Sequence, residues 1–160
     1  MVQIRKAVGA DLPEILKIYD YARDFMRRTG NMEQWAGGYP YREVLEQDIA
    51  LGQLYVVDDG TLCGVFAFIP GIDPTYNYIE GAWHYDTPYA AIHRVAASGT
   101  RRGILELCVE FCAQRCSHLR IDTHRDNTVM QRALEKQGFA PCGIIYLENG
   151  GPRLAYDRNR

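Results

Sequence analysis

A turn of glycine, hydroxyl and arginine residues at positions 98–103 is the stretch of this sequence whose residue types most directly suggest chemistry. Residues 91–97 before it are mostly small or apolar, as in a strand buried on both faces. From Ile104 onward, apolar residues recur every three or four positions, which predicts a helix. Glycines allow backbone N–H groups to approach a ligand, and a helix N-terminus carries partial positive charge. The pattern therefore predicts a site for a phosphorylated ligand, to which Arg101 and Arg102 add charge.

An alternative interpretation stays open, because many turns between a strand and a helix contain glycine and arginine and bind nothing. The turn is not a Walker loop, since no Gly-Lys-Ser/Thr follows it. It is not the dinucleotide-binding fingerprint either, since Gly99 and Gly103 lack the third glycine.

Length and composition restrict the class of protein. The 160 residues, of which 47% are hydrophobic, predict one domain spanning 1–160. A net charge of −2 and a pI near 6.1 argue against a nucleic-acid partner. We expect no signal peptide and no membrane partner, because no apolar run approaches the ~20 residues of a membrane span. Five cysteines without export signals predict free thiols and a cytoplasmic location.

Hydrophobic periodicity and turn residues predict an alternating series of strands and helices. In chain order these are a strand at 2–7, helices at 11–30 and 41–51, strands at 53–57 and 61–69, an irregular strand at 75–83, a strand at 91–97, a helix at 104–116, a strand at 119–123, a helix at 127–136, and strands at 139–147 and 153–157. Antiparallel hairpins at each end and a β-α-β crossover in the middle predict an α/β (α+β) fold, with a mixed sheet and helices on both faces.

Four pieces of sequence, taken with this order, resemble the GNAT superfamily of N-acetyltransferases over essentially the whole chain. The first is Ile-His-Arg-Val-Ala-Ala at 92–97, which is similar to the fourth strand of that fold, and the second is the glycine turn that follows. The third is Arg-Ile-Asp-Thr-His at 120–124, followed by Asp-Asn at 126–127. The fourth is Lys-Gln-Gly-Phe-Ala-Pro-Cys-Gly at 136–143. The last two are specific in combination.

The resemblance implies a mostly antiparallel sheet whose central parallel strands splay apart, with acetyl-coenzyme A in the gap as co-substrate. By analogy, the backbone of Val95 and Ala97 pairs with the pantetheine arm, and Asn127 contacts the coenzyme from the next helix. Backbone N–H groups hold the pyrophosphate at Gly99, Thr100, Arg101, Arg102, Gly103 and Ile104.

The activity implied is transfer of an acetyl group to the primary amine of a small acceptor by direct attack; the resemblance leaves a homodimer open. The alternative is a module of the same fold that binds acyl-coenzyme A without transferring the group. Two departures from the family pattern motivate it. The glycine turn is shortened before Ile104-Leu105, and Leu134 stands where many members carry the tyrosine acid.

His93 is the first candidate for the general base, because it lies two residues before Val95 and its unperturbed pKa is near neutrality. The alternative is a core histidine bonded to a neighbouring carbonyl. Asp122 and His124 end the next strand. We expect Asp122 to be structural, either bonding the loop or pairing with Arg94, and His124 is a second candidate for catalysis.

Weaker candidates complete the catalytic set. Glu80 could act as a base through a water, and Tyr146 or Cys142 could replace the missing acid. Aromatic residues gather where this fold forms its acceptor pocket and could hold an amine through cation–π contacts, or could simply cover the core. They are Trp35, Tyr39, Tyr41, Tyr76, Tyr78, Trp83 and Tyr85.

We expect no metal site. Cys108, Cys112 and Cys116 recur every four residues along one helix and lie close in sequence to His118. Tetrahedral zinc sites usually draw ligands from a turn and a separate element, so this stripe is more typical of a helix face packed in the core.

Overall fold

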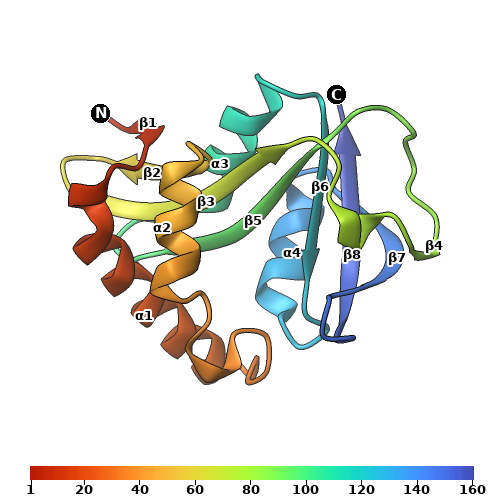
Figure 1. Cartoon of the computed structure of the whole chain (residues 1–160), viewed down its shortest axis with the longest axis horizontal. Helices are drawn as coiled ribbons and strands as arrows, with labels where there is room; N and C mark the ends of the chain where they lie inside the picture. Colours follow the sequence, from red (N-terminus) through yellow and green to blue (C-terminus); the bar gives the residue numbers. More distant parts are fainter.

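The protein, described over all 160 residues by a computed structural model, folds into one sheet flanked by four α-helices (Figure 1). The strands are β1 (Gln3–Lys6), β2 (Leu54–Asp58), β3 (Leu62–Pro70), β4 (Glu80–Gly81), β5 (Ala90–Ala97), β6 (His118–Thr123), β7 (Ala140–Tyr146) and β8 (Pro152–Asn159). The helices are α1 (Leu12–Arg28), α2 (Arg42–Ala50), α3 (Ile104–Ala113) and α4 (Thr128–Lys136). Three 3₁₀ turns accompany them at Gly9–Asp11, Ala36–Gly38 and Pro74–Tyr76.

The strand order is β1-β2-β3-β5-β6-β8-β7-β4, and every neighbouring pair is antiparallel except β5 and β6. This parallel pair is joined only at its start, where Ala90 faces Leu119 and Ala91 faces Arg120. Beyond these residues the two halves of the sheet diverge, as Figure 1 shows between β5 and β6. The predicted fold class and the splayed central pair are confirmed.

Apolar side chains bury both faces of the sheet. One large cluster lies between the sheet and α3 and α4, and it includes Cys108 and Cys112, so these two cysteines belong to the core. A second cluster lies under α1 and α2, on the half of the sheet formed by β2, β3 and β5. A smaller third cluster around Tyr76 and Ile145 lies where the segment between β3 and β5 covers the other half. On the face that carries α1 and α2, these two helices therefore cover one half of the sheet, and the segment between β3 and β5 covers the other half.

Two local predictions were wrong. The irregular strand expected at 75–83 is a 3₁₀ turn followed by the two-residue β4. The carboxylate of Asp73 accepts a hydrogen bond from Thr75 N at 3.0 Å, which favours the turn over an extended strand. The helix expected at 104–116 ends at Ala113. No helix is both long enough and apolar enough to cross a bilayer.

Candidate active site

A bulge in β5 shapes the strand at the divergence. Opposite the single β3 residue Phe66, β5 contributes two residues, Arg94 and Val95. Arg94 has φ +54°, in the left-handed region that non-glycine residues rarely adopt. A bulge of this kind bends the strand and increases its twist. The irregularity therefore lies where β5 turns away from β6.

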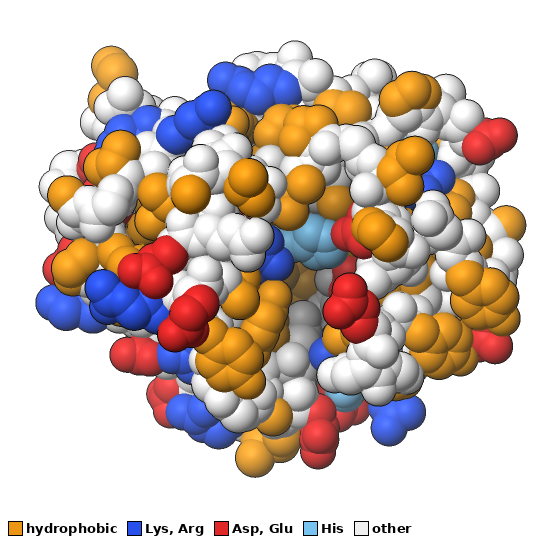
Figure 2. Space-filling model, viewed as in Figure 1, with side chains coloured by type: hydrophobic (Ala, Val, Ile, Leu, Met, Phe, Trp, Pro, Cys, Tyr) orange, Lys and Arg blue, Asp and Glu red, His pale blue; other side chains and the backbone are white.

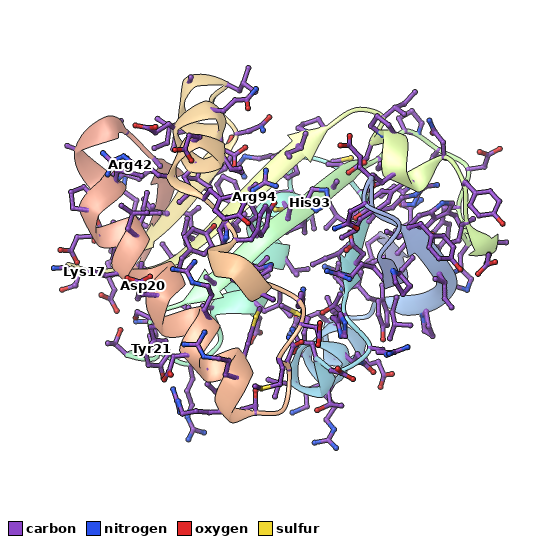
Figure 3. The ribbon with its side chains drawn as sticks, turned by 60° about the horizontal axis from the view of Figure 1, so that its bottom comes forward. Lys17, Asp20, Tyr21, Arg42, His93 and Arg94 are labelled. Carbon is purple, nitrogen blue, oxygen red and sulfur yellow. The ribbon has the colours of Figure 1, made fainter.

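The Arg94 side chain and carbonyl are fixed by neighbours from α1, α2 and the loop between them. Its guanidinium donates to both carboxylate oxygens of Asp48, at 2.8 and 2.9 Å, and to the Tyr39 hydroxyl at 3.1 Å. Its carbonyl oxygen accepts a hydrogen bond of 2.6 Å from Tyr19, a buried hydroxyl whose pKa is raised by burial. Figure 3 shows His93 and Arg94 next to each other on β5.

A cleft of about 790 Å³ occupies the gap between the two halves of the sheet. Figure 2 shows it as a hollow in the centre of this face, with acidic side chains on both sides. Its walls include consecutive residues from the diverging strands, His93, Arg94 and Val95 from β5 and Ile121, Asp122 and Thr123 from β6. The remaining charged residues of the lining are Glu33, Asp73, Glu148 and Arg153. Carboxylates thus outnumber guanidinium groups, which favours a cationic ligand.

His93 lies in the wall of this cleft, bonded to a carboxylate rather than to a main-chain carbonyl. Its Nε2 is 2.7 Å from Asp73 Oδ2. Burial alone would raise the pKa of Asp73, but the hydrogen bonds from His93 and Thr75 outweigh it and lower that pKa to about 2. Asp73 is therefore ionised at neutral pH and can only accept, which assigns a proton to His93 Nε2. In the neutral imidazole the lone pair is then on Nδ1.

A second carboxylate faces the other nitrogen of His93. Asp122 Oδ2 lies 3.9 Å from His93 Nδ1 and accepts a hydrogen bond of 2.7 Å from the Tyr76 hydroxyl. Burial and the Asp122 charge raise the pKa of Tyr76 well above its usual value, so this hydroxyl stays a donor. Of the two structural roles expected for Asp122, pairing with Arg94 was wrong, because Arg94 pairs with Asp48 instead.

The loop between α1 and α2 crosses from the α1 side of the cleft to the far wall. Gln34 Oε1 accepts hydrogen bonds from Asn31 at 2.9 Å, from Asn127 at 3.0 Å and from Thr123 at 3.4 Å. Its main-chain carbonyl accepts from Arg153 at 3.3 Å. Three of the predicted aromatic residues, Trp35, Tyr39 and Tyr41, line the cleft from this loop and its junction with α2.

The glycine turn follows β5 at the other end of the strand. Gly99 has φ +84°, which strains any other residue, and a Cβ there would lie 2.3 Å from the Tyr21 hydroxyl. Gly103, with φ +77°, immediately precedes α3. The backbone N–H groups of residues 101–106 donate to no protein acceptor. They are free to bind an anion, although the turn itself does not line the cleft.

The other predicted residues divide between the cleft and distant positions. Val95 and Asn127 line the cleft, and Asn127 Oδ1 also caps α4 by accepting from Met130 N at 3.0 Å. His124 is buried in the turn after β6, where Nδ1 accepts from Asp126 N and desolvation lowers its pKa; it does not line the cleft. Tyr146 donates to Glu80 at the β4–β7 edge of the sheet, also outside the cleft.

Three residues of the site were missed from the sequence. Asp73 lies in an aperiodic segment, Asp48 reads as part of a helix face, and Gln34 lies in a loop. The Asp-Pro dipeptide at 73–74 indicates only a turn. Their roles come from contacts with residues far away in the chain.

Solved structures of several acetyltransferases share this fold. The chain is 33% identical to an acetyltransferase of the GNAT family from Streptococcus agalactiae, with a TM-score of 0.90 over 99% of this chain and 95% of the other. A putative acetyltransferase from Staphylococcus aureus is 23% identical, with a TM-score of 0.71 over 98% of both chains. A ribosomal-protein-alanine N-acetyltransferase from Brucella melitensis is 21% identical, with a TM-score of 0.62 over 99% of both. No protein-family model and no curated protein matched the sequence.

Proposed function

Because this chain belongs to the GNAT family of acetyltransferases, we propose that it transfers an acetyl group from acetyl-coenzyme A to a primary amine. The observation that carries the proposal is the gap beyond Ala91, where β5 loses its parallel neighbour and a cleft opens beside His93–Val95. An unpaired strand edge can pair with an extended amide-containing ligand.

The chain's own groups fit the donor. The coenzyme supplies an activated acyl group as a thioester. The edge of β5 that faces β6 has no ladder partner beyond Ala91, so it can bind the amides of the pantetheine arm. The unpartnered N–H groups at the start of α3 and the cations Arg101 and Arg102 suit the phosphates. The N–H of Val95 is our proposed donor to the thioester oxygen.

His93 is the proposed general base. Alkylamines have a pKa of about 10 and are protonated at neutral pH, so the acceptor must lose a proton before it attacks. Nδ1 can take that proton, while Nε2 keeps its hydrogen bond to Asp73. The nearby carboxylate of Asp122 stabilises the imidazolium that forms, since opposite charges within a few ångströms attract.

The acceptor is proposed to be a small cation. Trp35, Tyr39 and Tyr41 line the cleft, where aromatic rings can attract an ammonium group, and the excess of carboxylates in the lining adds charge of the matching sign. The hydroxyl of Tyr39 accepts from Arg94, which leaves its own proton free to donate inside the cleft. Tyr39 is therefore a better candidate for the acid than Tyr146, which lies outside the cleft.

A combined binding and turnover screen tests the proposal. Acetyl-coenzyme A should raise the melting temperature, because a ligand of the native state stabilises it. A panel of polyamines, amino acids, aminoglycosides and peptides should then include acceptors that release free coenzyme A thiol. Absence of a thermal shift would contradict the proposed function. A thermal shift without thiol release for any amine would favour the non-catalytic module, for which the buried Leu134 at the usual acid position is the supporting observation.

A further inference from the structure

A second cluster of reactive side chains lies outside the cleft, where the segment between β4 and β5 meets β7 and β8. His84 Nδ1 lies 2.8 Å from Asp157 Oδ1, and Cys142 Sγ lies 3.2 Å from each of these two atoms. Three types of metal ligand, an imidazole, a thiol and a carboxylate, are thus within 4.8 Å of one another. Asp157 has a fully buried side chain, whereas that of His84 is 44% exposed and gives access to solvent.

A second histidine reaches the same carboxylate from inside the protein. His118 is 1% exposed, and its Nδ1 lies 3.0 Å from the Thr87 carbonyl oxygen. The Thr87 hydroxyl lies 3.1 Å from the same nitrogen. Nε2 has no hydrogen-bond partner and lies 3.4 Å from Asp157 Oδ2, which also accepts a hydrogen bond of 3.0 Å from His84 N. His118 therefore supports the Asp157 carboxylate from inside, as a neighbour of the cluster rather than a member of it.

We propose that His84, Cys142 and Asp157 form a binding site for a divalent transition metal of the zinc type. Zinc takes four ligands in a tetrahedral arrangement, and three side chains of the cysteine, histidine and carboxylate types leave the fourth position open to solvent. With bonds of about 2.0 to 2.3 Å, the ligand atoms of such a site are separated by roughly 3.3 to 3.8 Å. The separations of 2.8 and 3.2 Å among the three ligand atoms are close to this spacing, so the site needs little rearrangement.

A Cys-His-Asp nucleophile is the alternative for the same residues, and the geometry argues against it. A catalytic triad uses the two ring nitrogens of its histidine for different partners, whereas His84 Nδ1 contacts both the thiol and the carboxylate. A bound dication would compensate the charges of a cysteine thiolate and the carboxylate together.

The proposed ion would fasten the segment between β4 and β5 to the sheet. His84 comes from that segment, and Cys142 and Asp157 come from β7 and β8. The same segment is otherwise held by polar and cation–π contacts, such as Arg120 stacked between Trp83 and Tyr89 at 4.0 Å. Because the metal ligands are distant in sequence, binding favours the folded state and should raise the melting temperature.

Titration of the reduced, full-length protein with Co²⁺ tests the site independently of acetyl transfer. A cobalt ion bound by Cys142 gives a near-ultraviolet thiolate charge-transfer band and tetrahedral visible bands. We expect this spectrum at one equivalent, its loss on adding Zn²⁺, and a higher melting temperature with Zn²⁺. Cys142→Ser should abolish the charge-transfer band, whereas Cys63→Ser, which alters a buried thiol on β3, should retain it.

A second variant keeps the test decisive if Cys142→Ser does not fold. His84→Gln changes a half-exposed side chain and should weaken Co²⁺ affinity at least about tenfold. A wild-type protein without a charge-transfer band, or a band that Cys142→Ser or His84→Gln leaves unchanged, would overturn the proposal. None of these outcomes depends on whether the chain binds acetyl-coenzyme A.

Discussion

Two histidine–carboxylate pairs of nearly identical length lie in opposite surroundings. In the cleft, His93 is 2.7 Å from Asp73; between β7 and β8, His84 is 2.8 Å from Asp157. The first pair borders an open volume with a free ring nitrogen, which suits proton transfer. In the second pair the fully buried carboxylate also contacts a thiol and a second imidazole, which suits metal binding. The surroundings, rather than the hydrogen bond, distinguish the two.

The largest expected effect comes from removing the ring that faces the cleft. His93→Ala should lower kcat by about 10²- to 10⁴-fold, the usual contribution of a general base. Steady-state thiol release measures this loss. Acetyl-coenzyme A affinity, measured by calorimetry, should stay within about twofold, because the proposed donor contacts use the backbone. A kcat equal to that of the wild type would remove His93 from the mechanism.

The shape of the cleft also depends on the β5 bulge at Arg94 and Val95, whereas the cluster of His84, Cys142 and Asp157 lies away from this bulge. Asp48→Ala leaves the buried Arg94 guanidinium without its ion-pair partner and should lower the free energy of unfolding by about 3–5 kcal/mol. Urea denaturation measures the change. Asp24→Ala, which breaks the exposed contact with Arg28 at 2.8 Å, is the matched control and should cost far less. Equal losses of unfolding free energy in the two variants would show that the contact between Asp48 and Arg94 stabilises the fold no more than an exposed ion pair does.

Acid should weaken the cleft pair in a defined range. The pKa of Asp73 falls from 3.8 to about 2 in the folded protein, so its stabilisation is complete above pH 4 and disappears as the pH falls toward 2. The contribution is about 2 kcal/mol. Denaturation at a series of pH values should therefore give a shallower decline for Asp73→Asn than for the wild type between pH 4 and 2. Parallel curves would contradict the pairing with His93.

The smallest expected effect concerns the glycine turn. Gly103→Asp places a carboxylate beside the proposed phosphate site. Repulsion between this carboxylate and the phosphates, at the N-terminus of α3, should weaken acetyl-coenzyme A binding about tenfold. Gly150→Asp is the matched control, because Gly150 has a similar φ of +85° and lies in a loop far along the chain. Calorimetry should find normal affinity for the control. An unchanged affinity in Gly103→Asp would mean that the phosphates bind elsewhere.

Much of the fold could be predicted because its signals are local. The apolar faces of α1 and α3, and the turn that separates β5 from α3, follow from spacing within short windows. The resemblance to a known family then predicted the splayed strand pair, which no local pattern contains. The segment at 71–89 was predicted worst, because it lacks periodicity and takes its shape from contacts with β7 and β8.

The two sites differ in how far the sequence could predict them. His93 was identified from its place in β5, but its partner Asp73 lies 20 residues away in an irregular turn. The cluster around Asp157 was not predicted, since its three residues come from three separate segments. The regular spacing of Cys108, Cys112 and Cys116 reflects packing rather than metal binding, since Cys108 and Cys112 are core residues. Side chains that come together only in the tertiary structure have no regular spacing in the sequence, so sequence patterns cannot predict them.

Amide hydrogen exchange with and without acetyl-coenzyme A tests the central claim most directly. If the coenzyme pairs with the open edge of β5, exchange at Val95 and Ala97 should slow when it is added, together with exchange at the start of α3. The amides around Asp157, in the closed half of the sheet, should change little. Protection absent from β5, or confined to another part of the molecule, would contradict the assignment of the gap beyond Ala91 as the donor site.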